Sequence, residues 1–240
     1  MSDNKLTGYL KHQSFQPGIL SVFINPFFFI RYALFKNIRR YIPRLEGKLL
    51  DFGCGRKPYE NLFSVTEYVG ADMVETGHDH KNSKIDVYYD GKRLPFNDSV
   101  FDSLFCSEVL EHIFNPDEIL PELNRVLKPG AKALITVPFS WNEHEMPYDY
   151  ARYSSEGIKF LLEKNGFKII EVTKSGNFAR VNFQLWALYF FELFRKWGRA
   201  GYLLSLFFIV PINITGTILL VLFPRNESMY FTNIVLAEKI

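Results

Sequence analysis

Between Lys48 and Thr173, short apolar runs alternate with segments of helical periodicity. Turns rich in glycine and proline, such as Gly53-Cys54-Gly55 and Lys128-Pro129-Gly130, separate these segments. We predict strands over Lys48–Phe52, Glu67–Asp72, Lys84–Tyr89, Phe101–Ser107, Ala131–Pro138 and Phe167–Thr173. We predict helices over Pro58–Phe63, Val109–His112, Pro116–Leu127 and Ser154–Asn165. This alternation indicates an α/β fold with a mostly parallel sheet and helices on both faces.

A possible ligand site follows the first predicted strand. Gly53 and Gly55 come directly after it, at the carboxyl edge where open parallel sheets bind ligands, and glycine lets the backbone approach a ligand closely. The second predicted strand ends in Asp72, which is placed to accept hydrogen bonds from ribose hydroxyls. A dinucleotide fingerprint would have a third glycine where this chain has Pro58. The pattern therefore predicts a ligand with a ribose and without a pyrophosphate.

A set of motifs in a fixed order resembles the class I S-adenosylmethionine-dependent methyltransferases. The motifs are Leu49–Gly55, Tyr68–Asp72, Asp90–Phe96, Phe101–Asp102, Ser107–His112 and Leu127–Gly130. The resemblance implies a Rossmann-like sheet whose seventh strand is antiparallel, and Met229–Glu238 fits that strand. One departure is the short connection between the first two strands, which leaves room for only a clipped first helix.

The resemblance also implies a role for each residue of the cofactor site. Asp51, Gly53 and Gly55 would hold the methionine part of S-adenosylmethionine, and Asp72 would hold the ribose. Asp90 would bind the adenine amino group, and Ser107 and Glu108 would line the pocket beside the methionine and the methyl group. Asp102, Glu111, His112 and the two cysteines are interpreted as structural residues.

The loop after the fifth strand, residues 138–153, is dense in histidine, acidic and aromatic side chains. It follows a carboxyl strand end, so we expect it to face the pocket. His144 and Asp149 are the candidate catalytic residues, with His144 as a general base if the acceptor must lose a proton. The alternative is that Asp149 pairs with Arg152 and has a structural role. Similar loops in the family lie over the active site, often in enzymes of surface-glycan or lipid-linked substrates. No metal site is predicted.

Residues 1–46 are predicted to be an extension with a basic amphipathic helix and no signal peptide. The apolar positions recur at helical spacing: Phe27, Ile30, Leu34, Phe35, Ile38, Tyr41 and Ile42. The basic residues are Arg31, Lys36, Arg39, Arg40, Arg44 and Lys48. Such a segment can lie on an anionic membrane surface, or it can pack on the domain with a solvated basic face.

Residues 176–227 form a predicted hydrophobic helical insertion between the parts of the methyltransferase domain, 47–175 and 228–240. Leu203–Phe223 carries no charge and is long enough to span a bilayer. A single span is excluded because the chain must return to the sheet, so we expect an in-plane or re-entrant element that is broken near Pro211 and Asn213. The alternatives are a dimer interface and a hydrophobic lid over a lipid-like substrate.

The net charge of +2 does not indicate a nucleic-acid partner, and two cysteines favour a reducing compartment. The sequence therefore predicts a cytoplasmic methyltransferase, peripheral or monotopic on the inner face of the membrane. Its acceptor would be lipid-like, such as a glycan-lipid or a quinone precursor. The alternatives are a soluble small-molecule methyltransferase that forms a homodimer through the insertion, and a non-catalytic membrane scaffold with the methyltransferase fold.

Overall fold

The computed structural model describes residues 5–74 and 83–240. The chain divides into two compact units. The sheet unit comprises the described residues of Ile38–Lys174 together with Thr232–Ile240. The helical unit comprises those of Met1–Asn37 together with Ser175–Phe231. All of the predicted cofactor and catalytic residues belong to the sheet unit.

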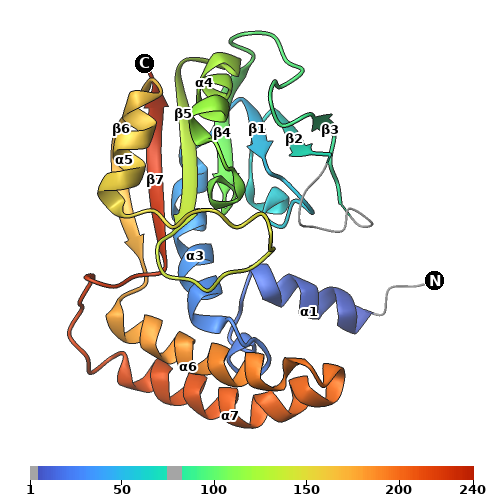
Figure 1. Ribbon diagram of the computed structural model, residues 1–240, viewed down its shortest axis with the longest axis vertical. Helices are drawn as coiled ribbons and strands as arrows, with labels where there is room; N and C mark the ends of the chain where they lie inside the picture. Colours follow the sequence, from blue (N-terminus) through green and yellow to red (C-terminus); the bar gives the residue numbers. More distant parts are fainter. Residues whose placement is uncertain (1–4, 75–82) are drawn as a thin grey trace. The chain divides into compact units, whose positions relative to one another are not determined.

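The sheet has seven strands in the order β3-β2-β1-β4-β5-β7-β6 (Figure 1). The strands are β1 (Lys48–Phe52), β2 (Glu67–Met73), β3 (Val87–Tyr89), β4 (Phe101–Ser107), β5 (Leu127–Pro138), β6 (Phe167–Ser175) and β7 (Thr232–Lys239). β1 pairs in parallel with β2 and β4, and β5 pairs in parallel with β4. β7 runs antiparallel to β5, with Ile135 opposite Val235. The predicted Rossmann-like sheet with an antiparallel last strand is therefore confirmed.

The core of the sheet unit lies between the strands and two helices, α4 (Pro116–Val126) and α5 (Ser155–Lys164), which run along the sheet in Figure 1. Leu120 and Leu123 of α4 and Leu162 of α5 are completely buried with the apolar side chains of β1, β4 and β5. Ser154 caps α5 by accepting a hydrogen bond from the Gly157 amide. Burial of this face fixes the register of the strands and thereby the positions of their carboxyl ends.

Four predicted elements, two helices and two strands, differ in length from those observed. Pro58–Phe63 and Val109–His112 contain only short 3-10 turns, at Glu60–Leu62 and Leu110–His112. The third strand covers only Val87–Tyr89, and directly before it the Asp86 carboxylate accepts the Gly70 amide. The fifth strand begins at Leu127, where a register shift against β4 accommodates Lys128-Pro129-Gly130 as a bulge.

The helical unit contains α1 (Lys5–Phe15), α2 (Ser21–Ile24), α6 (Phe178–Arg195) and α7 (Gly198–Leu219). It also contains most of α3 (Phe28–Tyr41), which continues into the sheet unit. The buried Gln184 of α6 accepts hydrogen bonds from the Phe29 and Ile30 amides and donates one to the Pro26 carbonyl. A single glutamine thus satisfies amides at the start of α3 that have no partner within the helix.

The expected break in the apolar run is absent, since α7 is continuous through Pro211. Asn213 is fully buried, and its side-chain amide donates to the carbonyls of Val22 and Asn25. Asn213 therefore joins α7 to the N-terminal segment. The proline removes one hydrogen bond within the helix, and packing against the rest of the unit holds the helix together.

Candidate functional site

The turn after β1 lies between the carboxyl ends of β2 and β4. Gly53 and Gly55 both have positive φ angles, of 72° and 47°, which glycine adopts without strain. A Cβ atom at Gly53 would lie 2.3 Å from a methyl carbon of Val109, so this position has no room for a side chain. A Cβ atom at Gly55 would meet no atom of the described residues within 4 Å. The backbone at Gly55 therefore borders space that none of the described side chains fills.

Asp51 supplies a buried carboxylate beside this turn. Its side chain accepts a hydrogen bond of 2.5 Å from the Tyr68 hydroxyl. Burial raises the pKa of Asp51 to about 7, although the hydrogen bond from Tyr68 and the nearby Lys57 ammonium lower the pKa in part. A buried carboxylate that is costly to ionise is suited to binding a cationic group, because the cation would stabilise the charged form.

Asp72 lies at the carboxyl end of β2, as predicted from the sequence. One carboxylate oxygen accepts the Gly55 amide at 2.8 Å, and the other accepts the Met73 amide at 2.8 Å. The side chain is thereby held next to the turn that carries the two glycines. This placement fits the ribose-binding role that the resemblance implies for Asp72.

The other predicted cofactor residues lie on β3 and β4. Asp90 is exposed directly after β3 and accepts the amides of Lys92 and Arg93, which lower the pKa of its carboxyl group. Ser107 is the last residue of β4 and Glu108 follows it, and both contact Thr136 of β5 through side-chain hydrogen bonds. Glu108 has a φ angle of 55°, a strained conformation for a non-glycine residue, and such strain is common at functional sites.

The loop between β5 and α5 is held by Asp149 and Arg152. The Asp149 side chain is almost completely buried and receives two hydrogen bonds from the Arg152 guanidinium, of 2.6 and 2.7 Å. It also accepts the His144 amide at 2.9 Å. Both carboxylate oxygens of Asp149 are therefore occupied by hydrogen bonds within the loop. Asp149 is a positioning residue for the loop that carries His144. This pairing of Asp149 with Arg152 is the structural alternative that the sequence predicts.

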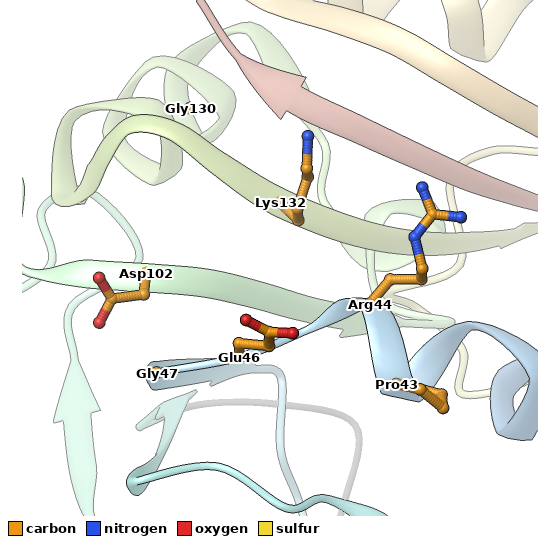
Figure 2. Close-up of a pocket in the computed structure, with 7 residues that line it drawn as sticks. All are labelled: Pro43, Arg44, Glu46, Gly47, Asp102, Gly130 and Lys132. Atoms are coloured by element: carbon orange, nitrogen blue, oxygen red, sulfur yellow. The ribbon is translucent and has the colours of Figure 1, made fainter.

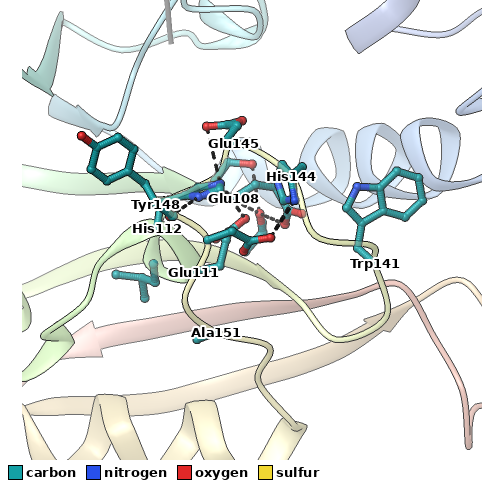
Figure 3. Close-up of polar contacts among 12 residues, drawn as sticks. Glu108, Glu111, His112, Trp141, His144, Glu145, Tyr148 and Ala151 are labelled. Carbon is teal, nitrogen blue, oxygen red and sulfur yellow. Dashed lines mark hydrogen bonds and ion pairs between the residues drawn. The ribbon is translucent and has the colours of Figure 1, made fainter. Parts of the chain in front are cut away.

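Glu111 and His112, for which the sequence alone predicts only structural roles, lie beside His144. Figure 3 shows their side chains converging, whereas Trp141 lies apart. One ligand atom from each of the three residues lies within 4.8 Å of the others. The His112 and His144 rings are 4.9 Å apart, edge to face. The signal that could have revealed the cluster is the spacing of Glu108, Glu111 and His112, which places three polar side chains on one turn.

A separate depression of about 520 Å³ lies at the opposite, amino edge of the sheet (Figure 2). Its charged lining residues are Arg44, Glu46, Asp102 and Lys132. Asp102 accepts the Lys48 amide and pairs with Lys128, and Lys132 pairs with Glu238. Asp102 therefore has the structural role that its position in the sequence predicts.

Comparisons with known proteins agree with this geometry. A family model described as a methyltransferase domain matches residues 29–172. An O-methyltransferase of Aspergillus nomiae is 33% identical over 168 residues, which cover 58% of this chain and 73% of the relative. A ubiquinone biosynthesis O-methyltransferase of Dechloromonas aromatica is 26% identical over 151 residues, which cover 57% of this chain and 62% of the relative. The match thus spans less than two thirds of the ubiquinone enzyme.

The fold is also found among solved structures. Phosphoethanolamine N-methyltransferase 2 of Haemonchus contortus, solved in complex with S-adenosyl-L-methionine, superposes with a TM-score of 0.54 at 20% identity. The alignment covers 98% of this chain and 57% of that one. The predicted cofactor fits this site, where Gly55 borders space that the described side chains leave unfilled and Asp51 and Asp72 stand beside it. The chain belongs to the class I methyltransferases, which use S-adenosylmethionine as their methyl donor.

Proposed function

We propose that this methyltransferase acts at the cytoplasmic surface of a membrane, on a lipid-linked or amphiphilic acceptor such as a glycan-lipid or a quinone precursor. The observation that carries the proposal is the polarity of α7. Four of its five buried residues are small or polar, the exception being Ile209, whereas its large exposed side chains are mostly apolar. This is the reverse of the pattern on a helix that packs against a protein core in water.

The two faces of α7 follow helical spacing. The buried face consists of Gly201, Ser205, Ile209, Asn213 and Gly216. The exposed face includes Leu203, Phe207, Ile214 and Ile218, and the Phe207 side chain is 77% exposed. A Cβ atom at Gly216 would lie 2.7 Å from the Phe29 ring, so close packing requires glycine there. Small residues at helix contacts and large apolar residues facing outward are typical of helices in lipid.

The connection between α6 and α7 adds groups that favour a membrane interface. Lys196 and Trp197 link the two helices, and Arg195 and Arg199 flank them. The Trp197 side chain is exposed, and the Lys196 ammonium lies over its ring. Tryptophan and basic side chains are enriched at the level of lipid headgroups. We therefore infer that the apolar face of α7 enters the lipid boundary in plane, with these residues at the headgroups.

Among the described residues, α7 is the single helix whose length and composition would allow it to cross a bilayer. The chain leaves the sheet at β6 and returns to it at β7, on either side of α6 and α7. An in-plane arrangement satisfies this connectivity without carrying Arg195, Lys196 and Arg199 across the membrane. An amphiphilic acceptor would then meet the enzyme at the surface where the acceptor itself resides.

We expect the triple variant Leu203→Ser/Phe207→Ser/Ile218→Ser to lose binding to anionic vesicles at every salt concentration. Each fully buried apolar side chain contributes about 1.5–3 kcal/mol, and this contribution is not screened by salt. Phe160→Ser is the matched control, because Phe160 is also highly exposed but lies on α5 of the sheet unit. Vesicle flotation measures the bound fraction.

Reversing the charge of Lys36 and Arg39 should weaken binding chiefly at low salt, because charge attraction is screened. Both side chains are exposed on α3, whereas Arg40 pairs with Glu171 and is less suitable for the test. A wild-type protein that is a discrete dimer in solution and does not bind vesicles would contradict the membrane proposal. That result would favour a dimer interface on α7.

The cofactor site has its own test, which does not depend on the acceptor. We expect Asp72→Ala to weaken S-adenosylmethionine binding by about 1.5–3 kcal/mol, the range for lost hydrogen bonds to a charged group. Isothermal titration calorimetry measures this change. Asp102→Ala is the control, because Asp102 lies at the amino edge of the sheet and should leave the affinity unchanged. Equal affinities of Asp72→Ala and wild type would contradict the assignment of Asp72.

A further inference from the structure

We propose that Glu111, His112 and His144 bind a divalent cation of the zinc type beside the cofactor site, and that this cation holds a hydroxyl oxygen of the acceptor. The proposal rests first on Glu111. Its side chain is 0% exposed, and neither carboxylate oxygen has a hydrogen-bond partner among the described residues. A buried carboxylate without hydrogen bonds is costly unless a cation compensates its charge.

The hydrogen bonds of His112 and His144 involve Nδ1 of each ring and leave Nε2 available to bind a metal. Nδ1 of His112 lies 2.8 Å from the Tyr148 carbonyl oxygen, so it donates its proton there. Nδ1 of His144 lies 3.2 Å from the Asn142 carbonyl and 3.3 Å from the Asp149 carboxylate. When the rings are neutral with the proton on Nδ1, Nε2 of each ring has a lone pair that can bind a metal. This arrangement, in which a carbonyl or carboxylate orients the second nitrogen, is the one that metal-binding histidines use.

The distances are close to those of a metal site. Nε2 of His112 lies 3.8 Å from Oε1 of Glu111, and the three ligand atoms lie within 4.8 Å of one another. Ligands of tetrahedral zinc at bonds of about 2.0–2.1 Å are separated by about 3.4 Å, so modest side-chain rotations complete the site. The ligands come from two segments, the turn after β4 and the loop after β5, which are joined by hydrogen bonds from the Tyr150 and Ala151 amides to the Glu111 carbonyl.

The surrounding charge also favours a cation. Oε2 of Glu145 lies 3.8 Å from Nε2 of His112, and Glu108 lies three residues before Glu111 on the same turn. The positive charge of Arg152 is paired with Asp149. Two imidazoles and one carboxylate suit Zn²⁺, Co²⁺ or Fe²⁺ better than Mg²⁺ or Ca²⁺, which prefer oxygen ligands alone.

Three protein ligands leave a position open for the acceptor, as in catalytic zinc sites. A hydroxyl bound there would release its proton to water, because a bound divalent cation lowers the pKa of its oxygen ligand. The oxygen would then attack the methyl carbon, forming the C–O bond as the C–S bond breaks and the electron pair remains on sulfur. This role would make the acceptor atom an oxygen. It rests on the proposed function, whereas the binding of the metal itself does not.

The test measures metal binding by the full chain without cofactor or acceptor. Protein freed of metal with a chelator is titrated with Zn²⁺ by calorimetry and with Co²⁺ by visible absorption. We expect one equivalent of each per chain and a Co²⁺ spectrum of imidazole and carboxylate ligation. Glu111→Gln and His144→Gln should each weaken Zn²⁺ binding at least about 100-fold, and Asp149→Asn, which alters the orientation of His144, about 10–100-fold.

His12→Gln is the matched control, because His12 is exposed on α1 in the helical unit and should leave metal binding unchanged. Circular dichroism and thermal unfolding identify any variant that fails to fold, and Glu111→Gln preserves the shape of the side chain. Absence of stoichiometric binding by folded wild type, or equal affinity of the Glu111 and His144 variants, would overturn the proposal. A failed metal titration with intact S-adenosylmethionine binding and vesicle binding would leave the proposed function standing.

Discussion

Replacing His144 with alanine is expected to lower turnover by about 10²–10⁴-fold, the range for loss of a group that handles the acceptor proton. The side chain is held by its Nδ1 contacts and by the bond from its own amide to Asp149. Its other nitrogen is thereby presented toward Glu111 and His112 (Figure 3). The measurement compares the methylated lipid products of cells that carry the wild-type or variant gene, as a mass shift of one methylene group.

Cofactor affinity provides the control for this variant. Asp51, Gly55 and Asp72 lie on β1, β2 and their turn, so His144→Ala should bind S-adenosylmethionine with nearly the wild-type affinity. Normal product formation by His144→Ala would contradict a catalytic role. It would indicate that His144 has only a structural role in packing the loop. The Zn²⁺ affinity of the same variant then separates its two possible actions. Lost turnover with unchanged metal binding indicates direct proton transfer, and lost turnover with lost metal binding indicates ligation.

The sheet could be predicted from the sequence because its signals are local. Apolar runs such as Leu49–Phe52 mark buried strands, and the order of the glycine turn and Asp72 places both at one edge. The exact lengths depend on tertiary contacts. The bulge at Lys128-Pro129-Gly130 lies between two stretches that pair with β4, at Leu127 and from Lys132 onward, and a local pattern does not show this pairing.

The cluster around Glu111 could not be predicted in the same way. His112 and His144 are far apart in the chain, and their meeting depends on how the Asp149–Arg152 pair folds the loop. Similarly, the continuity of α7 depends on Asn213, whose partners Val22 and Asn25 lie almost two hundred residues earlier. A proline and an asparagine in an apolar run indicate a break when the partners of the asparagine are unknown.

The affinity for S-adenosylmethionine is expected to fall about tenfold for each pH unit below about 7, because Asp51 must ionise to bind a cationic group. Burial raises the pKa of Asp51 to about 7. The cofactor is cationic at its sulfonium throughout this range, so its binding to the methionine side of the site drives release of the Asp51 proton. Calorimetry between pH 5.5 and 8 measures the slope, and buffers of different ionisation enthalpy count the released proton.

Asp51→Asn tests whether this residue is the source of the slope. An asparagine oxygen can still accept the Tyr68 hydroxyl, so the packing around β1 is preserved while the ionisable group is lost. We expect the Asp51→Asn variant to bind the cofactor more weakly than the wild type and with little dependence on pH.

The stability of the protein provides a second test. The folded-state pKa of Asp51 lies above the unfolded value of 3.8, so the wild type loses stability as the pH rises from about 4 to about 7. Asp51→Asn should therefore unfold at a higher temperature than the wild type at pH 8 and should lose this advantage near pH 4. A variant that is less stable than the wild type at pH 8, or a wild type whose cofactor affinity is flat across pH 7, would show that the Asp51 carboxylate is not the titrating group.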